Sequence, residues 1–318
     1  MTPTVQGAHE NSSCPLINLP FPLLYDWPGM APLREATGMA LHALVDALHV
    51  RLELAPGKLR LGQPCSLPFI QTVVPQAQAT GVPFTLLGAP EFNLAYVTRF
   101  VPASHRLPCK GEYCAALITH RSTQVETIGA LVRPRIAINE PGSFSGHHAL
   151  RAHLAASNLA PEFFPFSGEV TGSHHASLSA VANGSADLAA IDIACLAMAA
   201  THSPDLLETV QIVTLTRPVP APPFVLLGAA LDEPQAATVR ADLQAVLSTT
   251  ARLANGAQFI AGLRARRQED YTAVTDLLAA ADAAGMHSLV RSASRPAARH
   301  AAATSQDTDR SGETPKSI

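Results

Sequence analysis

The sequence has few charged residues and no long apolar run. Of its 318 residues, 15% are charged, and the formal net charge is -3. Its 22 lysines and arginines form no long patch outside residues 264–267 and the C-terminal tail, which disfavours binding to the phosphate backbone of a nucleic acid. No segment approaches the roughly 20 consecutive apolar residues that a membrane-spanning helix needs. We therefore expect neither a nucleic-acid partner nor a transmembrane segment.

The N-terminal region lacks the features of an export signal. No lysine or arginine precedes Arg34, and Pro20 and Pro22 interrupt the apolar residues 16–24. Because a secretory signal combines a basic start with an unbroken apolar stretch, the sequence predicts none. The protein is then expected to be cytoplasmic if its start is correct, or to begin after a lost leader.

Motifs for cofactors and metals are also missing. The sequence contains neither Gly-x-Gly-x-x-Gly nor Gly-x-x-x-x-Gly-Lys-Ser/Thr, which disfavours a nucleotide-binding domain. Its five cysteines match no close-spaced zinc pattern, and their odd number leaves at least one thiol unpaired within a monomer. We expect no cofactor and no metal. What is present is an ordinary globular composition, 47% hydrophobic, in a chain long enough for about two domains.

The most informative stretch spans residues 135–150. Residues 135–139 predict a short buried strand, 140–142 a turn, and the residues from Ser145 onward a helix. A helix start presents unpaired backbone N–H groups and the positive end of the helix dipole, and here the hydroxyls of Ser143 and Ser145 accompany them. The stretch therefore predicts an anion site, although either serine could instead only cap the helix.

Other strand-loop-helix joints lie along the chain. The predicted strands cover residues 59–62, 169–171 and 186–191, and the helices that follow them cover 67–79, 175–183 and 194–201. Successive units of this kind predict a parallel sheet with right-handed crossovers and a ligand beyond the carboxyl ends of its strands. Asp192 follows the third strand directly, where it could cap the next helix or face a ligand. The stiff, proline-rich residues 218–223 suit a crossing between domains.

Five segments together resemble the phosphate, phosphite and phosphonate binding proteins of ABC transporters. They are residues 24–26, 61–65, 139–146, 171–177 and 184–192, and the resemblance covers roughly residues 16–290. It implies an α/β, two-lobed periplasmic-binding-protein type II fold, in which each lobe is a mostly parallel sheet flanked by helices and the ligand cleft lies between the lobes. It places the first lobe in residues 16–118 plus 215–290 and the second in 119–214. Residues 1–15 are expected to form an irregular lead-in and 291–318 a disordered tail.

The resemblance also implies a set of ligand-binding residues, and it leaves alternatives open for several of them. The set is Ser143, Ser145, Gly146, His147, His174, Asp192, Gln63 and Tyr25. Phe144 and His147 depart from the asparagine and tyrosine expected beside the serine motif, which leaves the identity of the anion open. His174 could be a surface or capping residue, with His175 competing for its role, and Tyr25 could be a packing residue.

Cys65 and Cys109 resemble a cysteine pair of relatives. The pair could be a disulfide if the protein is exported, and would be two buried thiols in a reducing cytoplasm.

The leading hypothesis is a non-enzymatic, monomeric solute-binding protein that captures phosphate, phosphite or an organophosphonate for ABC transport, with a transporter permease as partner. One alternative is a cytoplasmic sensor of the same fold. Another is a lyase or biosynthetic enzyme that uses His174, Asp192 and Cys65 as acid-base or nucleophilic groups. The enzyme is disfavoured because no paired nucleophile and base occur at a diagnostic spacing.

Overall fold

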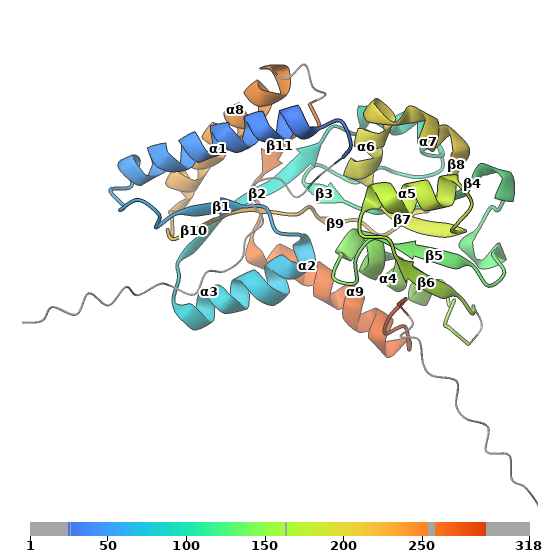
Figure 1. Cartoon of the computed structure of the whole chain (residues 1–318). Coiled ribbons are helices and arrows are strands. Elements are labelled where there is room, and N and C mark those ends of the chain that lie inside the picture. Colours follow the sequence, from blue (N-terminus) through green and yellow to red (C-terminus); the bar gives the residue numbers. More distant parts are fainter. Residues whose placement is uncertain (1–24, 26, 163, 254–257, 291–318) are drawn as a thin grey trace, which may run out of the picture.

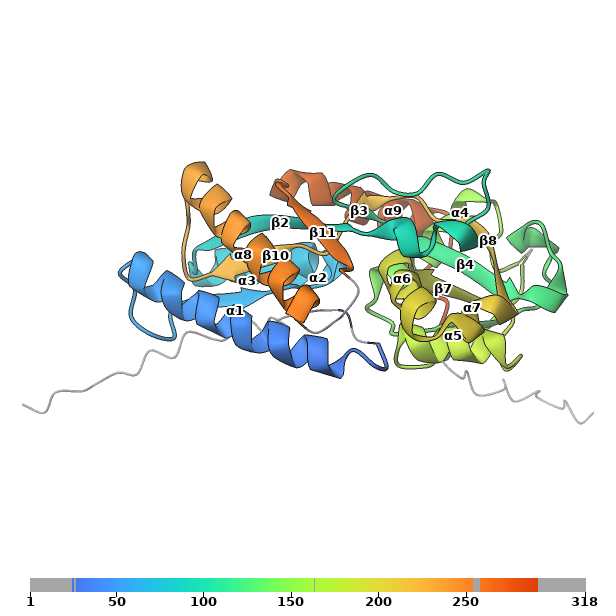
Figure 2. The same cartoon turned by 90° about the horizontal axis from the view of Figure 1, so that it is seen from above.

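The chain forms two lobes, each built around its own main β-sheet (Figure 1). The computed structural model describes residues 25, 27–162, 164–253 and 258–290. The expected lead-in 1–15, the expected first strand within 16–24 and the expected tail 291–318 lie outside these residues. Seen from above, the lobes lie side by side (Figure 2).

The first lobe contains a four-stranded antiparallel sheet between two helical layers. Its strand order is β1 (Arg60–Gly62), β10 (Phe224–Leu227), β2 (Phe84–Phe92) and β11 (Ile260–Arg264). Side chains alternate along β10, as a strand requires. Phe224 and Leu226 pack in one cluster with α1 (Ala31–Arg51) and α8 (Glu233–Leu253), whereas Val225 and Leu227 pack in another with the helical residues 66–80 (Figure 1).

A π-helical turn interrupts the helix predicted over residues 67–79. The segment consists of α2 (Ser66–Pro68), the π-helix η1 (Phe69–Val73) and α3 (Val74–Thr80). Pro75 has no N–H, and in a regular helix its ring would clash with the carbonyl four residues earlier. The wider turn just before Pro75 relieves this conflict, so the helical segment continues past the proline to Thr80.

The second lobe contains a five-stranded sheet. Its order is β6 (Ser167–Val170), β5 (Arg135–Ile138), β7 (Leu188–Asp192), β4 (Ala115–His120) and β8 (Val210–Leu215). Its helices are η6 (Phe144–His148), α4 (Ala149–Ala156), α5 (His174–Ala182), α6 (Ile193–His202) and α7 (Pro204–Thr209).

The sheets are less parallel than the sequence predicted. β5 runs parallel to β6 and β7, as the successive strand-loop-helix units require. β4, however, runs antiparallel to both β7 and β8, and every strand pair of the first sheet is antiparallel. The prediction of mostly parallel sheets is therefore wrong, because a strand from elsewhere in the chain, β10 in the first sheet and β4 in the second, lies antiparallel between two strands that local helices connect.

Short 3-10 helices lie in the connections. They are η2 (Leu94–Tyr96) and η3 (Thr98–Phe100) between β2 and β3, η4 (Arg121–Thr123) and η5 (Ile128–Ala130) between β4 and β5, and η7 (Gln268–Tyr271) before the last helix. None of the helices that the structure describes is long and apolar enough to cross a membrane.

Two crossing strands join the lobes, and side chains of the first lobe hold one of them. β3 (Glu112–Tyr113) pairs with β9 (Val219–Pro220). The carbonyls of three consecutive residues in the proline-rich crossing accept hydrogen bonds from buried side chains. Ser66 Oγ donates to Pro220 O (2.9 Å), Tyr271 Oη to Ala221 O (2.8 Å) and Gln63 Nε2 to Pro222 O (3.2 Å). These side chains donate to buried carbonyls that the two-residue pairing of β3 with β9 leaves without a partner.

The lobe boundaries expected from the sequence do not follow the sheets and helices closely. The boundary between residues 118 and 119 falls inside β4, all of which belongs to the second sheet. The last helix, α9 (Thr272–Ala283), was expected in the first lobe, yet it packs against α4 of the second (Figure 1). The buried Arg151 of α4 pairs with Asp282 of α9 at 2.9 Å.

The crossing hydrogen bonds predict a specific loss of stability. Tyr271→Phe keeps the buried ring but removes the donor to Ala221 O, so we expect the free energy of unfolding in urea to fall by about 1 to 3 kcal/mol. Tyr96→Phe is the matched control, since the Tyr96 hydroxyl makes no hydrogen bond among the described residues and its half-buried ring also packs on another aromatic, Phe259. Equal losses in the two variants would contradict the role given to the Tyr271 hydroxyl.

Candidate functional site

A cleft of about 530 Å³ lies between the lobes. The first lobe contributes residues from the loop and helical segment after β1, and the second contributes the loops after β5, β6 and β7. Its lining residues are Tyr25, Pro64, Cys65, Pro68, Thr72, Val73, Asn139, Glu140, Gly142, Ser143, Ser145, Gly172, Ser173, His174, Asp192 and Cys195. Five of the predicted ligand residues are therefore brought together, namely Tyr25, Ser143, Ser145, His174 and Asp192.

The serine loop opens a helix, as predicted, but the first turn is a π turn. Ser143 has extended backbone angles and its Oγ accepts the N–H of Gly146 at 3.1 Å, so Ser143 caps η6. Its hydroxyl proton still has the freedom to point at a ligand. The predicted capping and anion-binding roles of Ser143 are thus compatible in this geometry.

Gly146 is needed for space and does not line the cleft. A Cβ at this position would lie 1.7 Å from Oδ1 of Asn139, so no other residue fits without moving the asparagine. Asn139 is buried, and its Oδ1 has no hydrogen-bond partner among the described residues. Gly146 is therefore needed because the end of β5, at Asn139, lies very close to the start of the helix.

Ser145, His174, Asp192 and Tyr25 form one chain of polar contacts. Ser145 Oγ lies 3.1 Å from His174 Nε2, and His174 Nδ1 accepts the Asp192 N–H at 3.4 Å. In a neutral imidazole this arrangement puts the proton on Nε2, which then donates to Ser145 Oγ. The serine hydroxyl proton then points at the Asp192 carboxylate, or at a ligand when Asp192 is protonated.

Asp192 belongs to both the fold and the cleft. Its Oδ1 accepts the Ala194 N–H at 2.9 Å, which confirms that it caps α6, and its Oδ2 accepts a long hydrogen bond from Tyr25 Oη at 3.4 Å. The side chain is only 2% exposed. Tyr25 is also buried, and its ring packs edge-on against Phe92, so it combines the packing and cleft-lining roles considered from the sequence.

Burial keeps Asp192 and His174 of the cleft close to neutral, whereas Glu140 lines the cleft from an exposed position. Desolvation raises the pKa of Asp192 to about 7, despite the opposing hydrogen bonds from Ala194, Ser145 and Tyr25. Desolvation lowers the pKa of His174 to about 4, so this imidazole is neutral at physiological pH. No lysine or arginine is among the lining residues. The cleft thus offers neutral donors and a carboxyl that holds its proton over part of the physiological range.

Besides Gly146, two predicted ligand residues lie outside the cleft. Gln63 is buried and donates to Pro222 O in the crossing. His147 is also buried, with Nδ1 bonded to Pro141 O at 2.6 Å and Nε2 accepting the Leu289 N–H at 3.2 Å. His147 therefore fastens the serine loop to the segment after α9.

The disulfide considered between Cys65 and Cys109 is not formed, and both thiols are free. Cys109 is exposed near the start of β3, where its N–H donates to the Glu112 carboxylate at 3.2 Å. Cys65 instead lines the cleft. The two cysteines are therefore not two buried thiols either, which was the alternative expected in a reducing cytoplasm. Burial raises the pKa of Cys65, although N–H groups of Phe144 and Leu67 bond to the sulfur and oppose the rise.

Several lining residues were absent from the predicted set. Thr72 lies four residues after Pro68 in the helical segment, so the two residues share one face. Its hydroxyl among mostly apolar neighbours could have marked Thr72 as a residue of the cleft. Ser173 caps α5 by accepting the Ala176 N–H at 3.0 Å. Cys195 lies in the first turn of the helix that Asp192 caps, and could have been found from that position alone.

The fold and the cleft define a ligand-binding protein of the two-lobed type. The model of the family described as "ABC transporter, phosphonate, periplasmic substrate-binding protein" matches residues 92–277. The chain belongs to this family. It is accordingly a solute-binding protein and not an enzyme, and family membership implies a small ligand and an ABC transporter permease as partners.

Several solved structures resemble the chain, and one of them, with a TM-score of 0.50, supports the type II periplasmic-binding-protein architecture. A binding-protein component of an ABC phosphonate transporter from Pseudomonas aeruginosa has 13% identity and a TM-score of 0.50, over 80% of this chain and 82% of that one. A protein from Xanthomonas citri bound to ATP has 13% identity and a TM-score of 0.49, over 81% and 94% of the two chains.

PhnD1 from Prochlorococcus marinus, in complex with methylphosphonate, has 12% identity and a TM-score of 0.47, over 75% and 81%. No curated protein sequence matches the chain significantly.

Burial of Asp192 predicts a pH-dependent stability. Its folded pKa of about 7 exceeds the usual unfolded value of about 3.9, so the stabilising effect of its proton is fully present below about pH 4 and is lost as the pH rises through 7. Asp192→Asn keeps a capping oxygen and carries no charge. We expect it to exceed the wild type in unfolding free energy by about 2 to 4 kcal/mol at pH 8.5, in ligand-free urea titrations.

The difference between Asp192→Asn and the wild type should shrink toward pH 4. Asp187→Asn is the control, because Asp187 is partly exposed and its pairing with Arg135 at 2.8 Å lowers its pKa. That variant should be less stable than the wild type at pH 8.5. A stability difference for Asp192→Asn that does not vary with pH would contradict the buried-carboxyl argument.

Proposed function

We propose that the cleft binds an organophosphonate, with its oxyanion head held by neutral donors of the second lobe. The observation that carries this proposal is the convergence of Ser143, Ser145 and His174 beside the protonatable Asp192, in a cleft lined by no lysine or arginine. Such donors stabilise an oxyanion without a full countercharge.

The serine hydroxyls and the helix start form the proposed head-group site. Ser143 and Ser145 lie at the beginning of η6, where backbone N–H groups and the helix dipole favour an anion. His174 contributes through Ser145, since its Nε2 proton is directed at the serine oxygen and leaves the hydroxyl proton for Asp192 or, once Asp192 is protonated, for the ligand. Water exclusion between the lobes strengthens each of these contacts.

Asp192 is proposed to recognise the ligand in its protonated form. A second negative charge beside a bound oxyanion is unfavourable, so a bound anion raises the already elevated pKa of Asp192 further. The carboxyl then donates a hydrogen bond to a ligand oxygen, while Tyr25 and Ala194 hold it in place. Anion binding near neutral pH is thus linked to uptake of a proton by the protein.

The first lobe supplies an apolar wall that favours an organic substituent. Pro64, Pro68 and Val73 line the cleft opposite the serine loop. The cleft volume of about 530 Å³ would hold roughly 18 water molecules, which is far more than inorganic phosphate fills. The size and the apolar wall support an organophosphonate over phosphate or phosphite. We further propose that the protein acts as a monomer and has no nucleic-acid partner.

The donor role of Ser145 is tested by calorimetry. Ser145→Ala removes a hydroxyl directed at the ligand, so its binding free energy for methylphosphonate should weaken by about 1 to 3 kcal/mol with little change in stability. Ser179→Ala is the matched control, because Ser179 lies on α5 outside the cleft. Phosphate and sulfate are titrated in parallel. Unchanged affinity in Ser145→Ala, or no binding of any phosphonate to the wild type, would contradict the proposal.

A further inference from the structure

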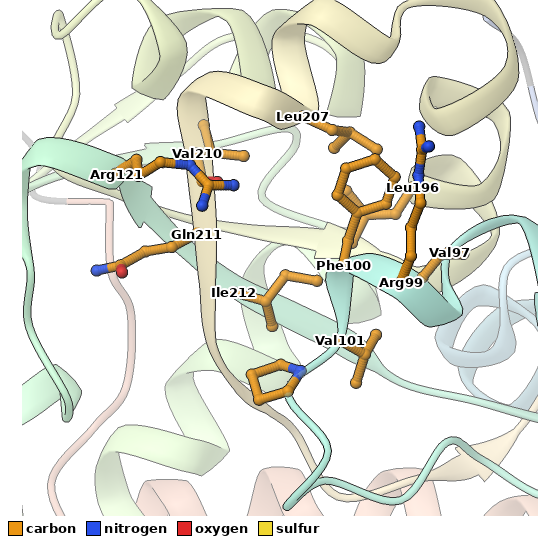
Figure 3. Close-up of a pocket in the computed structure, with 11 residues that line it drawn as sticks. Val97, Arg99, Phe100, Val101, Arg121, Leu196, Leu207, Val210, Gln211 and Ile212 are labelled. Carbon is orange, nitrogen blue, oxygen red and sulfur yellow. The ribbon is translucent and has the colours of Figure 1, made fainter.

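A second cavity, of about 290 Å³, lies on the second lobe away from the cleft (Figure 3). It is bounded by the β2–β3 connection on one side and by α6, α7 and β8 on the other. Its lining residues are Val97, Arg99, Phe100, Val101, Pro102, Arg121, Leu196, Leu207, Val210, Gln211 and Ile212. None of them lines the cleft, so an occupant of this cavity is separate from the proposed phosphonate.

The floor of this cavity is apolar and tightly packed. Val97 and Leu196 are completely buried, Leu207 is 2% exposed, and Ile212 lies among them at the centre of the view (Figure 3). Because Val97, Leu196 and Leu207 have almost no accessible surface, an apolar group in the cavity contacts the more exposed Phe100, Val101 and Ile212 and loses contact with water there. The cavity would hold roughly ten water molecules, which suits a small aromatic or short aliphatic body and excludes a folded peptide.

Arg121 brings a fixed positive charge to the cavity. Its Nε donates to Glu208 O at 2.8 Å and its Nη2 to Val210 O at 3.1 Å, which anchors the guanidinium at one wall. Figure 3 shows the side chain reaching from that wall toward the cavity. In the part of the chain that the structure describes, Arg121 forms no ion pair with a carboxylate. Its remaining N–H groups are left to bind an anion.

A second guanidinium lies at the opposite wall. Arg99 packs over the Phe100 ring, 4.6 Å from its centroid, and likewise has no carboxylate partner within the described ranges. No aspartate or glutamate is among the lining residues. The cavity therefore combines an apolar floor with two arginines whose charges are not compensated.

We propose that this cavity is a binding site for a small organic anion. The oxyanion head group, a carboxylate or a phosphonate, binds the Arg121 guanidinium, and a short apolar body packs on Phe100, Val101 and Ile212. A planar guanidinium with free N–H groups suits both head groups. Leu196 directly follows Cys195 of the cleft on α6, so the two sites are neighbours and have to be assayed separately.

The test uses benzoate and phenylphosphonate as probes and benzamide as the uncharged control. Each is titrated by calorimetry into the whole protein, both in the wild type and in Ser145→Ala, where the proposed cleft site is weakened. We expect benzoate to bind with one-to-one stoichiometry equally in both proteins, and benzamide not to bind. Phenylphosphonate can also enter the cleft, so its binding to the cavity is judged in Ser145→Ala. A failure of the proposed phosphonate site leaves this result unchanged, so the two proposals are tested independently.

Variants then locate the site. Arg121→Gln should weaken binding of the anion by about tenfold, because a charged donor is lost. Arg99→Gln should weaken it less, and Val101→Trp should abolish it by filling the cavity from a half-buried position. Arg106→Gln, an exposed change in the same connection but outside the lining, should have no effect.

Arg121→Gln also removes two hydrogen bonds to carbonyls, so thermal unfolding is followed for every variant. If Arg121→Gln does not fold, Arg99→Gln and Val101→Trp decide the outcome. The proposal is overturned if neither anion binds the wild type, or if binding is the same in the folded cavity variants as in Arg106→Gln.

Discussion

The burial of a carboxyl group without a cation beside it is the constraint that organises the cleft. Asp192 is enclosed at the end of β7, and its neighbours are donors and apolar side chains with no lysine or arginine. The Ala194 N–H and Tyr25 Oη satisfy its oxygens but do not offset the loss of solvation, so its pKa stays high. A protein that keeps such a group needs a use for its proton, and hydrogen bonding to an oxyanion is one.

The same constraint explains why the donors around it are neutral. Desolvation holds His174 uncharged, and in that state it can direct its Nε2 proton at Ser145. A cation in the same place would ionise Asp192 and set a carboxylate against the ligand. Neutral hydroxyls and backbone N–H groups avoid that conflict, and they select a ligand by its geometry and its protonation state. The cleft therefore favours a ligand that can share a proton with the protein.

The sequence predicted local parts of this site better than its long-range contacts. The strand, the Asp192 cap and the next helix are consecutive, and so are Ser173, His174 and α5, so periodicity and capping rules located them. Gln63 and His147 were misplaced because their partners, Pro222 and Leu289, lie 159 and 142 residues away. The antiparallel pairs likewise join strands that are distant in the sequence, such as β1 with β10 and β4 with β8. The second cavity brings together Arg99, Arg121 and Ile212, which no local pattern connects.

The central claim, that a neutral cleft binds an oxyanion by retaining a proton on Asp192, is tested most directly by counting protons. Calorimetric titration of methylphosphonate at pH 7.5, in buffers of different ionisation enthalpy, gives the number of protons taken up per ligand bound. The account predicts that the wild type takes up more protons than Asp192→Asn, by a substantial fraction of one proton, since ionisation of the ligand itself contributes to both. Binding of methylphosphonate with the same proton count in the two proteins would contradict it.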